Sequence, residues 1–151
     1  MPELIIADTS CLIVLTKTGQ LDLLRQLYGT ATTTPTVAAE YGLPLPAWVG
    51  QEAAADAGRQ QLLALLVDAG EASAIALALK RPGCTLILDD YKARKMAEKL
   101  SVRLTGTFGV LLRAKRQGLV PAVKPLLDQI RQTNFRFSAA LEIEILKQAG
   151  E

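Results

Sequence analysis

Short apolar runs alternate with amphipathic stretches along the whole chain. Four runs are rich in Ile, Leu, Val and Thr, and they predict short strands at residues 4–7, 31–34, 84–88 and 102–104. Two of them, "LIIA" and "CTLIL", show no alternation of polar and apolar residues. This pattern is typical of strands that are buried on both faces of a parallel sheet.

The stretches between and after these strands have the spacing and end signals of helices. They predict helices at residues 11–19, 20–28, 35–41, 52–67, 70–80, 91–100, 106–118 and 121–132, and a last helix that begins after Ser138. Residues 43–50, "LPLPAWVG", read as a proline-rich connection. Pro121 is expected in the first turn of the helix at 121–132, where proline is tolerated.

Strands and helices alternate from end to end, without a repeat or a composition shift that marks a domain boundary. This order predicts a single domain over residues 1–151, in which helices cover both faces of a central parallel sheet. The expected fold class is therefore α/β, a three-layer α/β/α sandwich. In such sheets, ligands bind beyond the carboxyl ends of the strands.

Carboxylates occur repeatedly where that edge is expected. Asp8 directly follows the first strand, Asp89 and Asp90 follow "LIL", and Glu40 and Glu71 lie in short helical segments that flank the strands. Each has an ordinary structural interpretation, because an Asp after a strand often caps a helix and an early Glu suits the helix dipole. Together they indicate a cation site, because converging carboxylates repel one another.

The composition narrows the chemistry of such a site. The chain has no histidine, which excludes Ser-His and Cys-His nucleophile pairs and the usual zinc sites. Oxygen ligands favour Mg²⁺ or Mn²⁺, and an ion held by carboxylates activates water for attack on a phosphodiester. A nuclease is the activity that best suits a histidine-free acidic cluster.

Other sequence features exclude several classes of protein. The net charge of +2 does not by itself indicate nucleic-acid binding. Cys11 and Cys84 lie far apart and are expected to be reduced core residues. We find no signal peptide and no apolar run of the roughly 18 residues that a membrane span needs. These features predict a cytoplasmic protein without a membrane contact.

Several segments, taken in order, resemble the PIN-domain-like family, in particular a prokaryotic branch related to the toxin ribonucleases of toxin–antitoxin systems. The segments are "IADTSCLIVLTKTG", "TPTVAAEYG", "DAGEASAIALALK", "LILDDYKARKMAEKL" and "RLTGTFGVLLRAK". The resemblance covers nearly the whole chain. It implies an α/β/α sandwich that binds Mg²⁺ or Mn²⁺ through acidic residues and cleaves RNA.

The resemblance also implies which residues form the site. The family's acidic positions match Asp8, Glu40, Glu71 and Asp90, with Asp89 beside the last of them. Which of the two adjacent aspartates is the inner metal ligand stays open. Ser10 follows the family's hydroxyl pattern and is expected to support Asp8 or a metal-bound water. A further acidic or polar position falls at Thr105 or Thr107, and neither is a carboxylate, which argues against a second tightly held ion. Thr107 is expected to be a supporting residue of the site.

Basic residues near these motifs are candidates for RNA contact. They are Lys17, which follows the first motif, and Lys92 and Arg94, which follow the aspartate pair. Basic side chains on this helix face are also explained by exposure to solvent alone. Aromatic residues make up only 5% of the chain, and no base-stacking platform is evident.

Three functions remain open at this stage. The first is a metal-dependent endoribonuclease, with RNA and an antitoxin protein as its partners. The second is a PIN-like protein with weak or no catalytic activity that binds RNA or protein. The third is a receiver-like phospho-switch, which also places aspartates at strand ends, but this chain has no convincing strand-end lysine for it. The helix at 20–28 and the leucine-rich stretch 61–67 offer surfaces for an antitoxin or a homodimer, although core packing explains both.

Overall fold

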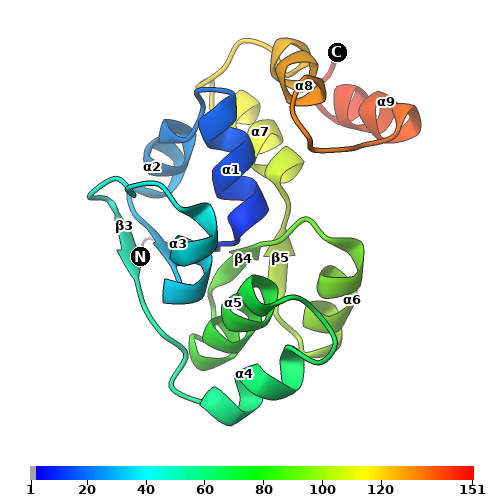
Figure 1. Ribbon diagram of the computed structural model, residues 1–151. Helices are drawn as coiled ribbons and strands as arrows, with labels where there is room; N and C mark the ends of the chain where they lie inside the picture. The colour runs from blue at the N-terminus through cyan, green and yellow to red at the C-terminus, as the bar shows by residue number, and fades with distance from the viewer. Residues whose placement is uncertain (1–2) are drawn as a thin grey trace.

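A computed structural model describes residues 3–151 and shows a five-stranded parallel sheet flanked by helices (Figure 1). The strands are β1 (Ile5–Ala7), β2 (Ala31–Thr33), β3 (Val49–Gln51), β4 (Thr85–Ile87) and β5 (Arg103–Thr105). The helices are α1 (Thr9–Lys17), α2 (Asp22–Tyr28), α3 (Pro35–Tyr41), α4 (Ala57–Leu63), α5 (Ala69–Lys80), α6 (Tyr91–Lys99), α7 (Thr107–Arg116), α8 (Lys124–Arg131) and α9 (Ala139–Gln148).

The strand order is β3-β2-β1-β4-β5, which puts β1 at the centre. Ile6 of β1 is paired with Thr32 on one side and with Leu86 on the other. The chain winds outward from β1 to β2 and β3, and then returns to place β4 on the opposite side of β1. The order therefore reverses between β1 and β4, which is the place where open α/β sheets bind ligands.

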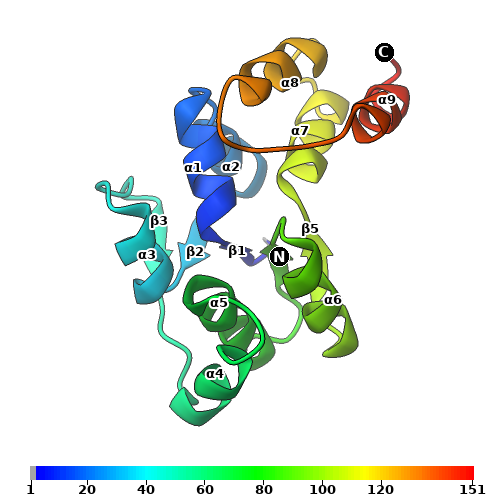
Figure 2. The same ribbon diagram turned by 45° about the vertical axis from the view of Figure 1, so that its right-hand side comes forward.

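Two hydrophobic clusters lie on opposite faces of this sheet, because neighbouring residues of a strand point in opposite directions. Ile5, Ala7 and Ile87 pack with α1, α2, α7, α8 and α9. Ile6 and Leu86 pack with α5 and α6 on the other face. Figure 2 shows the same separation, with α4, α5 and α6 on one side and α1, α2 and α7 on the other. The three-layer α/β/α sandwich expected from the sequence is confirmed.

Several expected boundaries were wrong. Residues 43–50 were expected to form only a connection, but β3 lies at their end, where Val49, Gly50 and Gln51 pair with β2. The helix expected at 52–67 is shorter, because Asp56 caps it and it begins only at Ala57. The prediction missed β3 because this short edge strand gives no periodic apolar signal in the sequence.

The start of α8 also differs from the expectation. Pro121 precedes the helix, which begins at Lys124 and has Pro125 in its first turn. The carboxylate of Glu151 accepts hydrogen bonds from the backbone N–H groups of Val123 and Lys124, at 2.7 and 3.0 Å. A residue from the far end of the chain thus caps this helix, and local sequence gave no sign of it.

The two surfaces considered for docking of a partner differ in their burial. Leu23 and Leu24 of α2 are buried, in agreement with core packing. In and after α4, Leu62, Leu65 and Leu66 are 66%, 80% and 48% exposed, so core packing is the wrong explanation for these three side chains.

Cys11 and Cys84 are buried and unpaired, as expected. None of the helices within residues 3–151 is long and apolar enough to cross a membrane.

Candidate functional site

Asp8 lies at the carboxyl end of the central strand β1. The strand is completely buried, and Asp8 itself is only 4% exposed. It stands at the N-cap position of α1, but its side chain makes no capping hydrogen bond. Its Oδ1 atom is buried and has no hydrogen-bond partner within residues 3–151. A buried carboxylate oxygen without a partner is unfavourable, and a proton or a cation relieves the cost.

Glu71 lies at the start of α5 in a capping box with Asp68. The backbone N–H of Glu71 donates to Asp68 Oδ1 at 2.8 Å, and the N–H of Asp68 donates to Glu71 Oε1 at 3.2 Å. These two hydrogen bonds cap the N-terminus of α5 and occupy one oxygen of each carboxylate. The ordinary explanation of Glu71 as an early helical glutamate is correct, and it leaves a second oxygen of this buried side chain unused.

Glu40 reaches the same region from α3. The hydroxyl of Thr9 donates to Glu40 Oε1 at 3.2 Å. Gly70 of α5 lies directly against this carboxylate, because a Cβ atom added at residue 70 would be only 1.8 Å from Glu40 Oε1. The absence of a side chain at Gly70 therefore makes room for Glu40 beside α5.

The two adjacent aspartates hold the first turns of two different helices. Asp90 Oδ2 accepts from the N–H of Ala93 at 2.9 Å and caps α6. Asp89 accepts from Thr107 twice, from the N–H at 2.8 Å and from the hydroxyl at 2.6 Å, and from Ser10 Oγ at 3.3 Å. Asp89 is thus fixed against the start of α7, whereas only one oxygen of Asp90 is engaged.

Burial and mutual repulsion raise the pKa of the acids at this edge. Burial is the main cause that raises the pKa of Asp8 to about 7, and the charge of Glu71 adds to it. The N–H of Thr9 lowers the pKa of Asp8, by less than burial raises it but by more than the charge of Glu71 does. Burial also raises the pKa of Glu71 to about 7, with contributions from the charges of Asp68 and Asp90, and it raises the pKa of Glu40. Asp8 and Glu71 therefore change their protonation near neutral pH.

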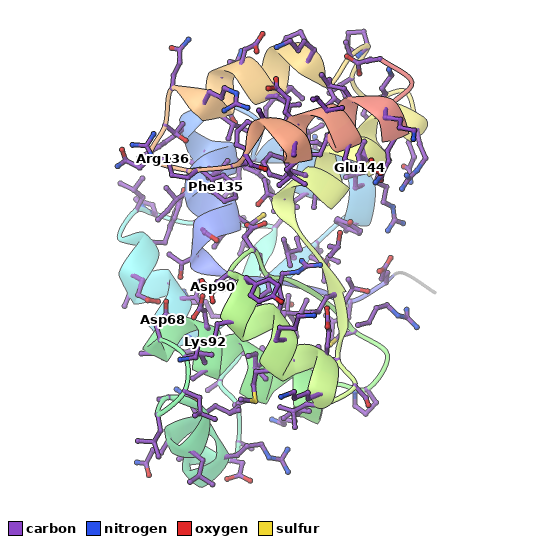
Figure 3. The ribbon with its side chains drawn as sticks, turned by 90° about the vertical axis from the view of Figure 1, so that its right-hand side faces the viewer. Asp68, Asp90, Lys92, Phe135, Arg136 and Glu144 are labelled. Atoms are coloured by element: carbon purple, nitrogen blue, oxygen red, sulfur yellow. The ribbon has the colours of Figure 1, made fainter. Side chains whose placement is uncertain are left out.

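All these carboxylates line one open cavity of about 580 Å³. Its acidic residues are Asp8, Glu40, Asp68, Glu71, Asp89 and Asp90. The opposite wall is formed by Asn134, Phe135 and Arg136, from the connection between α8 and α9. Figure 3 shows Asp68 and Asp90 on one side of this site and Phe135 and Arg136 on the other. The carboxylates that the sequence placed at strand ends do come together at one edge of the sheet.

A divalent cation suits the donor atoms of this cavity. Mg²⁺ and Mn²⁺ bind oxygen ligands, and Mg²⁺ commonly takes only one or two carboxylates and keeps several waters. The unpartnered Oδ1 of Asp8 and the free oxygens of Glu71 and Asp90 meet that requirement. Within residues 3–151, however, no group of three or more acidic, Cys or His side chains is gathered closely enough to hold a metal. The described residues therefore form no closed cage, and an ion bound here would keep several of its waters.

The three expected RNA-binding residues differ in their surroundings. Arg94 is half-buried, and its guanidinium donates to the backbone carbonyl of Leu88 at 2.7 Å, so it braces the end of β4. Lys92 is exposed on α6 but does not line the acidic cavity. Lys17 is exposed at the end of α1 and lines two smaller hollows beyond it.

Sequence reasoning missed Asp68, Tyr91 and Arg136. A capping-box search would have found Asp68, since "DAGE" has an acidic cap three residues before Glu71. Tyr91 follows the aspartate pair directly and lines the cavity. Nothing in the sequence indicated Arg136, because it reaches the cavity only through the packing of α8 and α9 on α7 and α1.

Thr107→Val is expected to lower the free energy of unfolding by about 2 kcal/mol. Thr107 is completely buried, and its hydroxyl donates a short hydrogen bond to the Asp89 carboxylate. Without that donor, Asp89 loses the shortest of its charge-assisted hydrogen bonds. Urea denaturation measures the change. Ser10→Ala is the matched comparison and is expected to cost less than about 1 kcal/mol, because the Ser10 bond is longer, at 3.3 Å against 2.6 Å. Equal losses in both variants would contradict this assignment.

Comparison with known proteins gives one match. A family model described as a PIN domain matches residues 4–151, which is nearly the whole chain. No curated protein and no solved structure matches the chain.

Proposed function

The chain belongs to the PIN-domain family, and from this premise we propose that it is a metal-dependent endoribonuclease. The observation that carries the proposal is the buried Oδ1 of Asp8, which has no hydrogen-bond partner within residues 3–151 and lies in a cavity lined by six carboxylates. Mg²⁺ or Mn²⁺ is the cofactor that this set of oxygen atoms suits. RNA is the substrate that the family membership favours.

The hydrogen bonds support particular roles for the acids. Asp8 and Glu71 are the proposed direct ligands, since each is buried and keeps an oxygen without a partner. Asp90 is the better third candidate, because both oxygens of Asp89 already accept hydrogen bonds at the start of α7. Asp89 is then a positioning residue, and Glu40 completes the negative charge around the ion.

Hydrolysis of a phosphodiester needs only water as its second reactant. The water oxygen bonds to phosphorus, the bond from phosphorus to one ribose oxygen breaks, and the departing oxygen takes up a proton. A divalent ion bound here would polarise the phosphoryl oxygen and activate the water. In the metal-free protein the pKa of Asp8 and that of Glu71 lie near 7, and a cation bound by these two carboxylates would displace their protons.

The proposal is tested by incubating the protein with labelled single-stranded RNA in Mn²⁺, in Mg²⁺ and in EDTA. We expect fragments with either ion and intact RNA in EDTA. Intact RNA under all three conditions would overturn the endoribonuclease assignment.

A PIN-like protein that binds RNA or protein without cleaving it is the alternative. It is favoured by Thr107, which is not a carboxylate although the family pattern admits an acidic residue there, and by the hydrogen bonds that Asp89 and Asp90 already accept at the starts of α7 and α6. Binding of Mn²⁺ in a calorimetric titration, without RNA cleavage, would support this alternative.

We further propose that residues 1–151 act as one domain in the cytoplasm, which is consistent with the buried, unpaired Cys11 and Cys84.

A protein partner, either an antitoxin or a second copy of the chain, stays a prediction, and Leu62, Leu65 and Leu66 are its best candidate surface. We expect light scattering to detect dimers that increase with protein concentration. Leu65→Glu is expected to return the protein to a monomer, because a charge in a leucine contact is costly. Leu43→Glu is the control, since Leu43 is 57% exposed on the connection between α3 and β3. A wild-type protein that is monomeric at every concentration would contradict the homodimer.

A further inference from the structure

Tyr91 is an exposed aromatic residue at the mouth of the acidic cavity. It is the first residue of α6, directly after Asp90, and its side chain is 74% exposed. Lys95, one helical turn later, places its Nζ atom 5.3 Å from the centre of the Tyr91 ring. This cation–π contact keeps the ring beside a positive charge and leaves most of the ring in solvent. The core does not use this aromatic surface.

The opposite wall of the cavity carries a positive charge. Arg136 is exposed on the connection between α8 and α9, and no carboxylate within residues 3–151 forms a salt bridge with it. Its neighbour Phe135 packs edge-on against Phe108, with the ring centres 5.5 Å apart. Figure 2 shows this connection passing across α1 and α7. Phe135 therefore anchors the segment, and Arg136 stays at the rim, across the cavity from Tyr91.

The cavity continues along α1 into a second hollow of about 200 Å³. The two spaces share Ser10, Ile13, Asn134 and Phe135, and Lys17 lines the second one. An open path thus runs from the exposed ring of Tyr91, past the carboxylates, to a basic side chain at the end of α1. A path of this kind is longer than a single nucleotide needs and suits an extended chain.

We propose that this path binds single-stranded RNA, with one base stacked on Tyr91 and the backbone held by Arg136 and Lys17. The inference rests on the proposed function, whose substrate it takes to be single-stranded RNA, and adds the residues that hold that strand. The six carboxylates repel phosphate, so binding must come from the rim. An unpaired base stacks on an aromatic ring without regard to its sequence, and cations along the path bind the phosphates.

The single-stranded form follows from the chemistry of stacking. In a duplex, each base is already stacked on its neighbours and paired, so neither face is available to Tyr91. Because Tyr91 is adjacent to Asp90, a base stacked on its ring brings the neighbouring phosphate to the carboxylates. Tyr91 is thus proposed to select unpaired RNA and to place it for cleavage.

Fluorescence anisotropy with a labelled RNA of about ten nucleotides tests the proposal. The measurement is made in EDTA, so that binding is read without cleavage. We expect Tyr91→Ala to raise the Kd roughly tenfold or more, and Tyr91→Phe to bind like the wild type because the ring is kept. Leu43→Ala is the matched control: it removes a side chain that is 57% exposed and lies outside the cavity, and the Kd is expected to stay unchanged.

Salt dependence separates stacking from charge. Arg136→Ala is expected to reduce the slope of log K against log salt by about one, whereas Tyr91→Ala leaves the slope unchanged. Arg116→Ala removes an exposed arginine from the end of α7, outside the path, and is the control for charge. With duplex RNA of the same sequence, Tyr91→Ala is expected to have no effect.

The outcomes distinguish this inference from the proposed function. Wild-type affinity in Tyr91→Ala, equal weakening for duplex and single strand, or no binding of single-stranded RNA would each overturn the inference. Stacking on Tyr91 without cleavage in Mn²⁺ or Mg²⁺ would support the inference and overturn the nuclease assignment. Cleavage that does not depend on Tyr91 would support the nuclease assignment and overturn the inference about Tyr91.

Discussion

Asp8→Asn is expected to reduce metal-dependent RNA cleavage by about a hundredfold or more, while the protein keeps its fold. The amide has the shape of the carboxylate but no negative charge, so it is a poor ligand for a hard divalent ion. Asp8 is also the one acid of the cavity whose buried oxygen has no hydrogen-bond partner within residues 3–151, so the substitution takes no partner from that oxygen. Initial cleavage rates at saturating Mn²⁺ measure the loss.

Asp56→Asn is the matched control for this experiment. Asp56 caps α4 by accepting the N–H of Arg59 at 2.9 Å, and it lies outside the acidic cavity. Asparagine caps a helix about as well as aspartate, so both stability and cleavage are expected to stay near wild type. A calorimetric titration of Asp8→Asn should also show weaker Mn²⁺ binding. Cleavage at the wild-type rate in Asp8→Asn would remove the metal ligand on which the nuclease proposal depends.

The metal-free protein is expected to lose stability as the pH rises from 5.5 to 8, by on the order of 2–4 kcal/mol in the free energy of unfolding. Asp8 has a folded-state pKa of about 7, raised from an ordinary value of 3.8. Between these two values the folded protein holds a proton that the unfolded chain has released, so the derivative of stability with pH is negative. The contribution is complete below the unfolded pKa and is lost as the pH passes through 7. Glu71, whose pKa is also raised to about 7, acts in the same direction.

Urea denaturation at a series of pH values measures this slope. Carboxyl groups whose pKa is lowered by partners, such as Glu3 and Glu142, act in the opposite direction, but only below their ordinary value of 4.5. The chosen pH window therefore excludes them. Asp8→Asn is expected to remove about half of the slope, because Glu71 still contributes, and to be more stable than the wild type at pH 8. A stability that rises across this window in the wild type would contradict the burial and repulsion described for Asp8.

Much of the fold was predictable because it depends on local patterns. Unbroken apolar runs indicated the inner strands, and their alternation with amphipathic stretches indicated a parallel sheet. The missing strand, β3, is an edge strand that follows two prolines and contains Gly50, so Val49 is its only β-branched residue and it has no periodic signal. Its pairing with β2 is made by backbone groups, which the side-chain pattern does not report. The start of α8 was also mispredicted, because its cap is Glu151.

The candidate site was predictable in part for a similar reason. The end of a strand is a local feature, and parallel strands bring their ends together whatever the loops between them do. This reasoning correctly predicted that Asp8, Glu71 and Asp90 lie together at one edge of the sheet. It was not enough for Asp68, whose role depends on a reciprocal bond with Glu71, or for the α8–α9 connection that forms the opposite wall of the cavity.

The sequence by itself determined which kinds of atom are available for chemistry: carboxylate oxygens at strand ends and no imidazole. Only the tertiary structure decided which of those oxygens remain free. The Asp89 carboxylate accepts a hydrogen bond from Thr107, and one oxygen of Asp90 accepts a hydrogen bond from Ala93. Asp8 Oδ1, in contrast, is buried and receives no hydrogen bond within residues 3–151. The physical reason is that backbone and hydroxyl donors compete for every carboxylate, and the outcome depends on which helix starts pack beside it.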